Sequence, residues 1–376
     1  MNILVINCGS SSIKYELFDM PKQKSIIKGS VEHIGEKGIK VKNHYSALET
    51  ILSKIISLRD YTSVIKKIKG SNRLRDLDGI GHRVVHGGER FKKPVLIDKG
   101  VISGIRACCK LAPLHNPANL EGIIASRQLL GSDVPQVAVF DTAFYSQLPN
   151  YAYLYALPYQ LYKMFGIRRY GFHGTSHEYV AQEVSLILKK PLARLKLITC
   201  HLGNGCSITA IKRGRAIDTS MGFTPLEGLV MGTRCGDIDA AIVIYLVRDR
   251  GWNIKRVDRI LNKQSGLKGI SGIGNDMRQL TKEAKRGNER ARLAIDIFIY
   301  RIRKYIGAYL AIMGDCDAIV FTAGIGQNQP EIRRMICAGL FTHLKTRPRI
   351  LVVPTWEELL IARKSYDIIK RRQSYD

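Results

Sequence analysis

The stretch from Asn2 to Phe18 reads NILVINCGSSSIKYELF, an apolar run, a Gly/Ser turn and a second run of alternating character. The first run predicts a strand over 2–7, and the turn covers 8–12. Ile13, Tyr15 and Leu17 alternate with polar residues, which is typical of a half-buried strand over 13–18. The chain is therefore expected to open with a β-hairpin.

The same pattern recurs near the middle of the chain. A strand is predicted over 195–201, a Gly turn over 202–205 and a second strand over 207–211. Gly9 and Gly203 stand at equivalent points of the two hairpins, which indicates two related halves. Each turn can offer backbone N–H groups to a phosphate, although most hairpins only connect strands.

The rest of the chain favours an α/β fold. Strands are predicted over 135–140 and 317–322, and helices over 116–130, 177–189, 238–248 and 288–313. Asn116 followed by Pro117 is typical of a helix start. The second of these strands runs into the Gly turn 323–326, and Pro330 then suits the first turn of another helix, which is a nucleotide-binding context. The polar segment 66–75 is expected to be a surface connection.

Composition limits the classes of protein that remain. The 376 residues favour two domains, and 45% of them are apolar, as in globular proteins. No leader peptide and no membrane-spanning run is expected, and the eight scattered cysteines form no C-x-x-C pair. These features predict reduced thiols and a cytoplasmic location. The net charge of +27 comes from dispersed basic residues, so a positive field that attracts small anions is favoured over nucleic-acid binding.

Several long motifs follow one another along nearly the whole chain. They are Asn7-Cys-Gly-Ser-Ser-Ser12 with Lys14, Gly81-His-Arg-Val-Val-His-Gly-Gly-Glu89, Leu111-Ala-Pro-Leu-His-Asn-Pro117, Val139-Phe-Asp-Thr-Ala-Phe144, Tyr170-Gly-Phe-His-Gly-Thr-Ser-His177, His201-Leu-Gly-Asn-Gly205, the stretch Asp218 to Asp239 with Met231-Gly-Thr-Arg-Cys-Gly-Asp237 inside it, Phe321-Thr-Ala-Gly-Ile-Gly326 and Pro354-Thr-Trp-Glu-Glu358. A P-loop is absent, and so are the protein-kinase signatures. The motifs resemble the acetate kinase family of the actin, hexokinase and Hsp70 superfamily.

The resemblance implies two ribonuclease H-like domains with a nucleotide cleft between them. Residues 1–145 would form the first domain, to which a C-terminal helix over 358–376 returns, and 146–357 the second. The implied reaction converts ATP and acetate to ADP and acetyl phosphate, with Mg²⁺ or Mn²⁺, in a homodimer. A propionate or butyrate kinase and a non-catalytic actin-like ATP-binding protein remain as alternatives.

The resemblance also implies roles for single residues. Arg83, Arg234, Asp141 and His173 are the catalytic candidates, and His115 and His201 are expected to contact phosphate or the transition state. The acyl pocket would be lined by Val85, Leu114, Phe172 and Pro225, of which three are also common core residue types. The nucleotide candidates are Ser12, Lys14, His201, Asn204, Gly205, Asp276, Arg278, Gly324, Ile325 and Asn328. Asn7 and Glu357 are the metal candidates, and Glu358 competes with Glu357.

The chemistry of the guanidinium group supports Arg83 and Arg234 as catalytic candidates. A planar guanidinium can bridge a carboxylate and a phosphoryl oxygen, which lysine cannot do. Asp141 ends a buried strand, and a carboxylate acceptor needs no general base at neutral pH, so Asp141 is expected to orient an arginine or Mg²⁺. The chain departs from the family pattern at Cys235, Met277 and Gln327 and in a shortened segment over 339–352.

Overall fold

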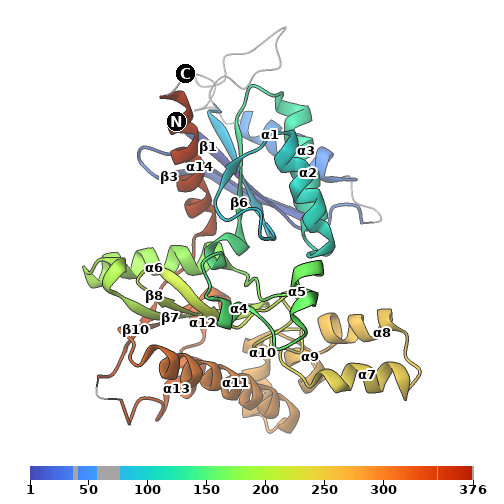
Figure 1. The fold of residues 1–376 in the computed structure, drawn as a ribbon, viewed down its shortest axis with the longest axis vertical. Coiled ribbons are helices and arrows are strands. Elements are labelled where there is room, and N and C mark those ends of the chain that lie inside the picture. Colours follow the sequence, from blue (N-terminus) through green and yellow to red (C-terminus); the bar gives the residue numbers. More distant parts are fainter. Residues whose placement is uncertain (37–40, 57–76, 345, 375–376) are drawn as a thin grey trace. The chain divides into compact units, whose positions relative to one another are not determined.

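The computed structural model describes residues 1–36, 41–56, 77–344 and 346–374 (Figure 1). The predicted connection over 66–75 lies outside the described residues. The chain divides into two units, Met1–Ser146 with Trp356–Asp376, and Gln147–Thr355. None of the helices in the described part combines the length and the apolar character needed to cross a bilayer.

The first unit is built on a six-stranded sheet. Its strands are β1 (Asn2–Cys8), β2 (Ser12–Asp19), β3 (Lys24–Glu32), β4 (Gly79–Val84), β5 (Val95–Leu96) and β6 (Gln136–Phe140), and its helices are α1 (His44–Ile56), α2 (Lys99–Ala107), α3 (Asn116–Leu130) and α14 (Glu357–Gln373). The strand order is β3-β2-β1-β4-β6-β5. The opening hairpin is antiparallel, as predicted, and β1, β4 and β6 are parallel.

The second unit is built on a five-stranded sheet. Its strands are β7 (Lys196–Leu202), β8 (Cys206–Lys212), β9 (Arg215–Thr219), β10 (Ala318–Thr322) and β11 (Arg349–Val352), in the order β11-β10-β7-β8-β9. Its helices are α4 (Asn150–Tyr153), α5 (Tyr159–Phe165), α6 (Gly174–Leu188), α7 (Ala240–Arg248), α8 (Ile254–Arg259), α9 (Gly266–Ser271), α10 (Met277–Lys285), α11 (Glu289–Met313), α12 (Ala323–Asn328) and α13 (Pro330–Cys337).

The two sheets repeat one topology. In each sheet the first three strands (β1–β3 or β7–β9) are antiparallel to one another. Two further strands lie on the other side of the first strand and run parallel to it, β4 and then β6 in one sheet and β10 and then β11 in the other. The predicted α/β fold with two related halves is therefore confirmed. The shortened segment over 339–352 still forms β11, which pairs with β10 from Ala318 opposite Arg349.

Some predicted elements differ from the structure. Helix α7 begins at Ala240, two residues after the predicted start at 238, because Asp239 is its N-cap. Helix α6 begins at Gly174, three residues before the predicted start, because His173 adopts a left-handed backbone conformation that starts the helix there. The predicted turn over 323–326 is helical, since α12 begins directly after β10 at Ala323. Pro330 does occupy the first turn of α13 as predicted.

Helix α14 covers one face of the first sheet, and α1, α2 and α3 lie on the other (Figure 1). Two glycines of β4 permit this close approach. A Cβ on Gly79 would lie 2.2 Å from Ile369 Cδ1, and a Cβ on Gly81 would lie 2.5 Å from Ser365 Oγ. Since side chains alternate along a strand, Arg83 projects from the same face, toward the end of the sheet where α14 begins.

Candidate active site

Arg83 is held by two carboxylates of its own unit. Its Nη2 donates to Asp141 Oδ2 at 2.8 Å and its Nε to the same oxygen at 3.2 Å, while Nη1 lies 3.2 Å from Glu357 Oε2. The Asp141 side chain is only 1% exposed, and that of Arg83 is 17% exposed. Burial by itself lowers the pKa of Arg83, but the charges of Asp141 and Glu357 outweigh burial and raise this pKa above its ordinary value. Arg83 is therefore a permanently charged, oriented guanidinium.

A polar row crosses the same sheet beside Arg83. Asn7 and Lys14 are direct partners in the β1–β2 hairpin, so their side chains leave the same face. The parallel register pairs Ile6 with His82, which makes Asn7 and Arg83 the next residues along β1 and β4. Lys14, Asn7 and Arg83 thus follow one another on three adjacent strands.

The first turn of α3 fixes the ends of β1 and β4. Asn119 accepts from the Val85 backbone N–H at 3.0 Å and donates to the Cys8 carbonyl oxygen at 2.7 Å. Asn116 makes the equivalent pair of bonds to the backbone of His86, at 3.0 and 2.8 Å. The candidate His115 occupies the N-cap position of this helix, and its side chain makes no capping hydrogen bond. These buried asparagines were not among the predicted site residues, although the N-cap pattern marked their position.

In the second unit, several candidates meet at the β7–β8 turn. The rings of His173 and His201 stack with centroids 4.2 Å apart. A Cβ on Gly205 would lie 3.2 Å from His173 Nε2 and 3.3 Å from Arg234 Nη2, so the glycine keeps this turn open between them. His173 has a φ of 57°, a conformation that is uncommon for residues other than glycine and often marks functional positions.

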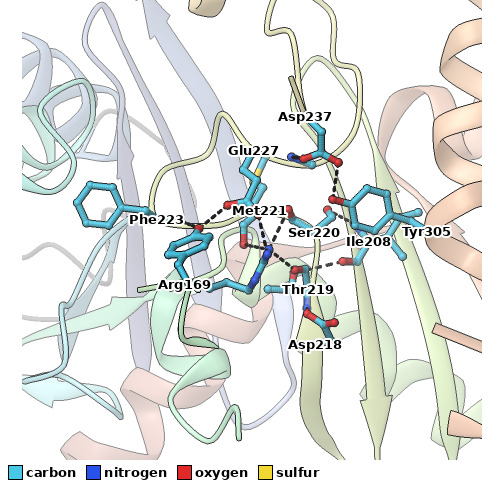
Figure 2. A network of polar contacts seen from close by, with 12 residues as sticks. Arg169, Ile208, Asp218, Thr219, Ser220, Met221, Phe223, Glu227, Asp237 and Tyr305 are labelled. Atoms are coloured by element: carbon cyan, nitrogen blue, oxygen red, sulfur yellow. Dashed lines mark hydrogen bonds and ion pairs between the residues drawn. The ribbon is translucent and has the colours of Figure 1, made fainter. Parts of the chain in front are cut away.

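Arg234 is fixed differently from Arg83. Its Nη1 donates to the Pro225 carbonyl oxygen at 2.6 Å, and burial lowers its pKa from the ordinary value. The loop that carries Pro225 and Arg234 is anchored by the hydrogen-bond network in Figure 2. There, Arg169 donates to the carbonyl oxygens of Thr219 (2.8 Å) and Ser220 (3.2 Å) and pairs with Glu227 at 2.6 Å.

The same network continues through two tyrosines. Tyr155 donates to Glu227 and accepts from the Phe223 N–H at 2.8 Å, and Tyr305 donates to Asp237 at 2.8 Å. Burial, followed by the nearby carboxylate, raises the pKa of both tyrosines, which remain neutral donors. The 218–239 motif contains most members of this network, but it did not indicate that Tyr155, Arg169 and Tyr305 join them, because these three lie far away along the chain.

A pocket of about 430 Å³ gathers most of the nucleotide candidates. Its lining comprises Gly203, Asn204, Asn275, Asp276, Met277, Arg278, Gly324, Ile325, Asn328 and Gln329. A Cβ on Gly324 would meet nothing within 4 Å, so this position opens onto free space. Ser12 and Lys14 belong to the other unit, as do the acyl candidates Val85 and Leu114, whereas Phe172 and Pro225 belong to this one.

The fold and these clusters define an α/β protein with two related sheets, each bearing polar residues at a hairpin turn and at the end of a neighbouring parallel strand. The acetokinase family model matches residues 2–345. The chain therefore belongs to the acetokinase family.

Relatives agree over almost the full length. An acetate kinase of Clostridium novyi (strain NT) is 47% identical over 406 aligned residues, with 99% of each chain covered. The crystal structure of Porphyromonas gingivalis acetate kinase is 40% identical with a TM-score of 0.89, covering 98% of this chain and 99% of that one. A propionate kinase from Francisella tularensis subsp. tularensis SCHU S4 has the same identity and TM-score, covering 97% and 99%.

Proposed function

We propose that this protein transfers the γ-phosphoryl group of ATP reversibly to acetate, giving acetyl phosphate and ADP. The observation that carries the proposal is Arg83, a guanidinium kept charged and oriented by Asp141 and Glu357 beside the polar row of Asn7 and Lys14. Such a group suits an acceptor that is itself a carboxylate, because it can bind the carboxylate and a phosphoryl oxygen together.

Arg83 and Arg234 are proposed to stabilise the phosphoryl group in flight. In a loose transition state, negative charge spreads over the equatorial oxygens of this group, and positioned arginines lower its energy. Asp141 is proposed to orient Arg83 rather than to take a proton, since acetate is ionised at neutral pH. His173 is proposed as a hydrogen-bond donor to the same group, and His201 as a phosphate contact.

Asn7 and Glu357 are the proposed Mg²⁺ or Mn²⁺ ligands. They supply hard oxygen donors, and Mg²⁺ commonly uses only one or two carboxylates together with substrate phosphates and water. Glu358 stays the competing ligand. When bound, the ion would neutralise phosphate charge.

ATP is the proposed phosphoryl donor in preference to pyrophosphate. The pocket beside Gly324 supports this choice, since its free volume of about 430 Å³ is of the size typical for small-molecule sites. Its lining includes Asn204, Asp276, Ile325 and Asn328, which we propose as adenosine contacts, and Ser12, Lys14 and Gly205 are proposed to contact phosphate.

Val85, Leu114, Phe172 and Pro225 are the proposed acyl pocket. A small apolar pocket would favour acetate over longer acids, each methylene misfit being worth about 1–3 kcal/mol. The likeness to a propionate kinase at the same identity as to an acetate kinase keeps propionate as the competing substrate.

The deciding experiment is a hydroxamate assay of the purified protein with acetate, propionate and butyrate, using ATP and pyrophosphate in turn. Acetyl hydroxamate that forms fastest with ATP and acetate is the expected result. A higher kcat/KM with propionate would make the protein a propionate kinase. ATP binding without any acyl phosphate would instead favour the actin-like alternative.

We also propose a homodimer in the cytoplasm. Helix α7 supports the dimer, since none of its residues is buried although it carries Ile242, Ile244, Tyr245 and Val247. Ile244→Glu should lower the mass measured by light scattering to that of one chain, and Lys255→Glu on α8 is the charge control.

The proposed cytoplasmic location is consistent with the cysteines. All eight of them are free, and free thiols are typical of a reducing compartment.

A further inference from the structure

One buried carboxyl group of the first unit has no role in the proposed reaction so far. Glu16 on β2 is only 4% exposed. Its Oε2 accepts a hydrogen bond from Trp356 Nε1 at 2.9 Å, whereas Oε1 is also buried and has no hydrogen-bond partner among the described residues. Burying a polar atom without a partner costs free energy. Stability alone therefore does not account for a glutamate at this position.

Trp356 occupies the N-cap position of α14 without acting as a cap. A capping side chain accepts from a backbone N–H of the first turn, but an indole has a donor and no acceptor. Its side chain accordingly makes no capping hydrogen bond. The contacts that hold it come from β2 instead, because its N–H binds Glu16 and its ring centroid lies 5.7 Å from that of the fully buried Phe18. The start of α14 is thus fixed by tertiary contacts rather than by a local cap.

The first turn of α14 leads directly to the candidate site. Glu357 follows Trp356, and its Oε2 lies 3.2 Å from Arg83 Nη1. Glu16 is two residues from Lys14 on β2, so their side chains leave the same face of the sheet. The contact between Glu16 and Trp356 therefore lies behind the polar row that contains Lys14, two residues further from the hairpin turn.

We propose that Glu16 and Trp356 are positioning residues that fix the first turn of α14 and thereby hold the Glu357 carboxylate in place as a ligand of the divalent cation. The proposal rests on the phosphoryl-transfer function proposed above. Each residue of an α-helix changes the direction of the side chain by about 100°, so a first turn that opens or rotates displaces this carboxylate. Groups that orient a metal ligand typically contribute about 10–100-fold to metal affinity.

A role in packing alone makes a different prediction about stability. Glu16→Leu removes the buried carboxyl group and keeps a side chain of similar size, a change that is often neutral or stabilising. Trp356 is partly exposed, so its N–H can bind water in this variant. We expect the urea midpoint of Glu16→Leu to equal or exceed that of the wild type while cation affinity falls. Packing alone predicts a lower midpoint with unchanged cation affinity.

The first test needs neither catalysis nor a metal. The Leu360 N–H bonds to the Trp356 carbonyl oxygen at 3.3 Å, so its exchange with deuterium reports whether the first turn of α14 is closed. Mass spectrometry of the full chain, with peptides that include or exclude Leu360, should show faster exchange at this amide in Glu16→Leu and unchanged exchange in the later turns. Unchanged exchange at Leu360 would overturn the proposal.

Cation binding is the second test. Electron paramagnetic resonance of free Mn²⁺ gives its Kd for the full chain saturated with ADP. Glu16→Leu should raise this Kd at least about tenfold, whereas Glu16→Gln, which keeps an oxygen that accepts from Trp356, should stay within about threefold of the wild type. Adding Trp356→Phe to Glu16→Leu should weaken binding no further, because both residues act through one contact. This double variant gives the same readouts should Glu16→Leu alone not fold.

Gln23→Gly is the matched control. Gln23 accepts from Arg363 Nε at 2.8 Å, so it joins the turn after β2 to a later part of the same helix, and its φ of 50° suits glycine. It should keep the wild-type Kd for Mn²⁺ and the wild-type exchange at Leu360. An equal loss in Gln23→Gly, or an unchanged Kd in Glu16→Leu, would overturn the proposal. If the wild type neither binds Mn²⁺ with ADP nor makes acyl phosphate, the proposed function fails, while exchange at Leu360 still decides whether Glu16 fixes the first turn.

Discussion

Arg83 is expected to contribute both to kcat and to the free energy of unfolding, and a set of substitutions at this residue can measure the two contributions separately. Arg83→Ala removes three donor contacts to Asp141 and the ion pair with Glu357. If Arg83 contacts the phosphoryl group as proposed, the loss should fall on kcat more than on KM, since the charge it binds develops in the transition state. Arginines in phosphoryl transfer are worth on the order of 10³-fold or more in kcat.

The structure also predicts a loss of stability. Asp141 is 1% exposed, so Arg83→Ala leaves a buried carboxylate without its guanidinium. Breaking a buried ion pair on one side costs about 3–5 kcal/mol. Replacing both charges by neutral groups is far less costly, so the double variant Arg83→Met with Asp141→Asn should recover most of the free energy of unfolding.

The assay is a comparison of kcat and urea unfolding for the wild type, Arg83→Ala, Arg83→Lys and the double variant. We expect Arg83→Lys to fold well and remain far below wild-type kcat, because it keeps the charge but loses the fork that binds Asp141. The double variant should be stable and inactive. If either Arg83→Ala or the double variant keeps kcat within about threefold of the wild type, Arg83 is a structural residue and the mechanism is wrong.

Three further perturbations follow from single sites. Gly324→Phe should fold normally and raise the KM for ATP sharply, because a side chain there enters the free pocket. Gly307→Phe, at an equally open position on helix α11, is the control. An unchanged KM for ATP in Gly324→Phe would exclude Gly324 from the adenosine site. Val85→Ala should improve kcat/KM for butyrate relative to acetate, and an equal loss on all acids would make Val85 a packing residue. Burial lowers the pKa of His82 from 6.5 to about 4, so between these values the unfolded chain binds more protons and stability should fall as the pH falls. This difference corresponds to about 3 kcal/mol, which urea unfolding at several pH values should detect. The loss should be smaller by about that amount in His82→Gln but not absent, because burial also lowers the pKa of His86 and His177.

Local chemistry was sufficient to predict strands β1, β2, β6, β7, β8 and β10 and helices α3, α6, α7, α11 and α13, but not the remaining strands or the short helices of the second unit. The period-two pattern after Ser12 and the Asn116-Pro117 start placed β2 and α3 within a residue of their observed bounds. The helix α6 was predicted three residues short because its start depends on the left-handed backbone of His173. That conformation is imposed by the surrounding structure, and because the residue is not a glycine, the sequence gives no signal for it.

The contacts inside the candidate site are less predictable, because they join residues far apart in sequence. Arg83 and Asp141 are 58 positions apart, and Ser207 is 34 and 30 positions from His173 and His177, which it bridges. The four-residue spacing of His173 and His177 did not predict their shared contact, because His173 precedes helix α6 in a left-handed conformation and the helical i, i+4 geometry does not apply to it.

The repeated topology explains why unlike residues occupy equivalent places. In both sheets the parallel strand next to the first hairpin strand ends beside the hairpin turn, β4 next to β1 and β10 next to β7. Ligands of α/β proteins bind at such carboxyl ends. At this end the first sheet carries the charged Arg83, whereas the second continues into α12 and presents Gly324, which has no side chain. Under the proposed function, the same scaffold would supply a guanidinium for the reacting group in one unit and free space for a nucleoside in the other, and a duplication could diverge in function by changing only residues at these strand ends.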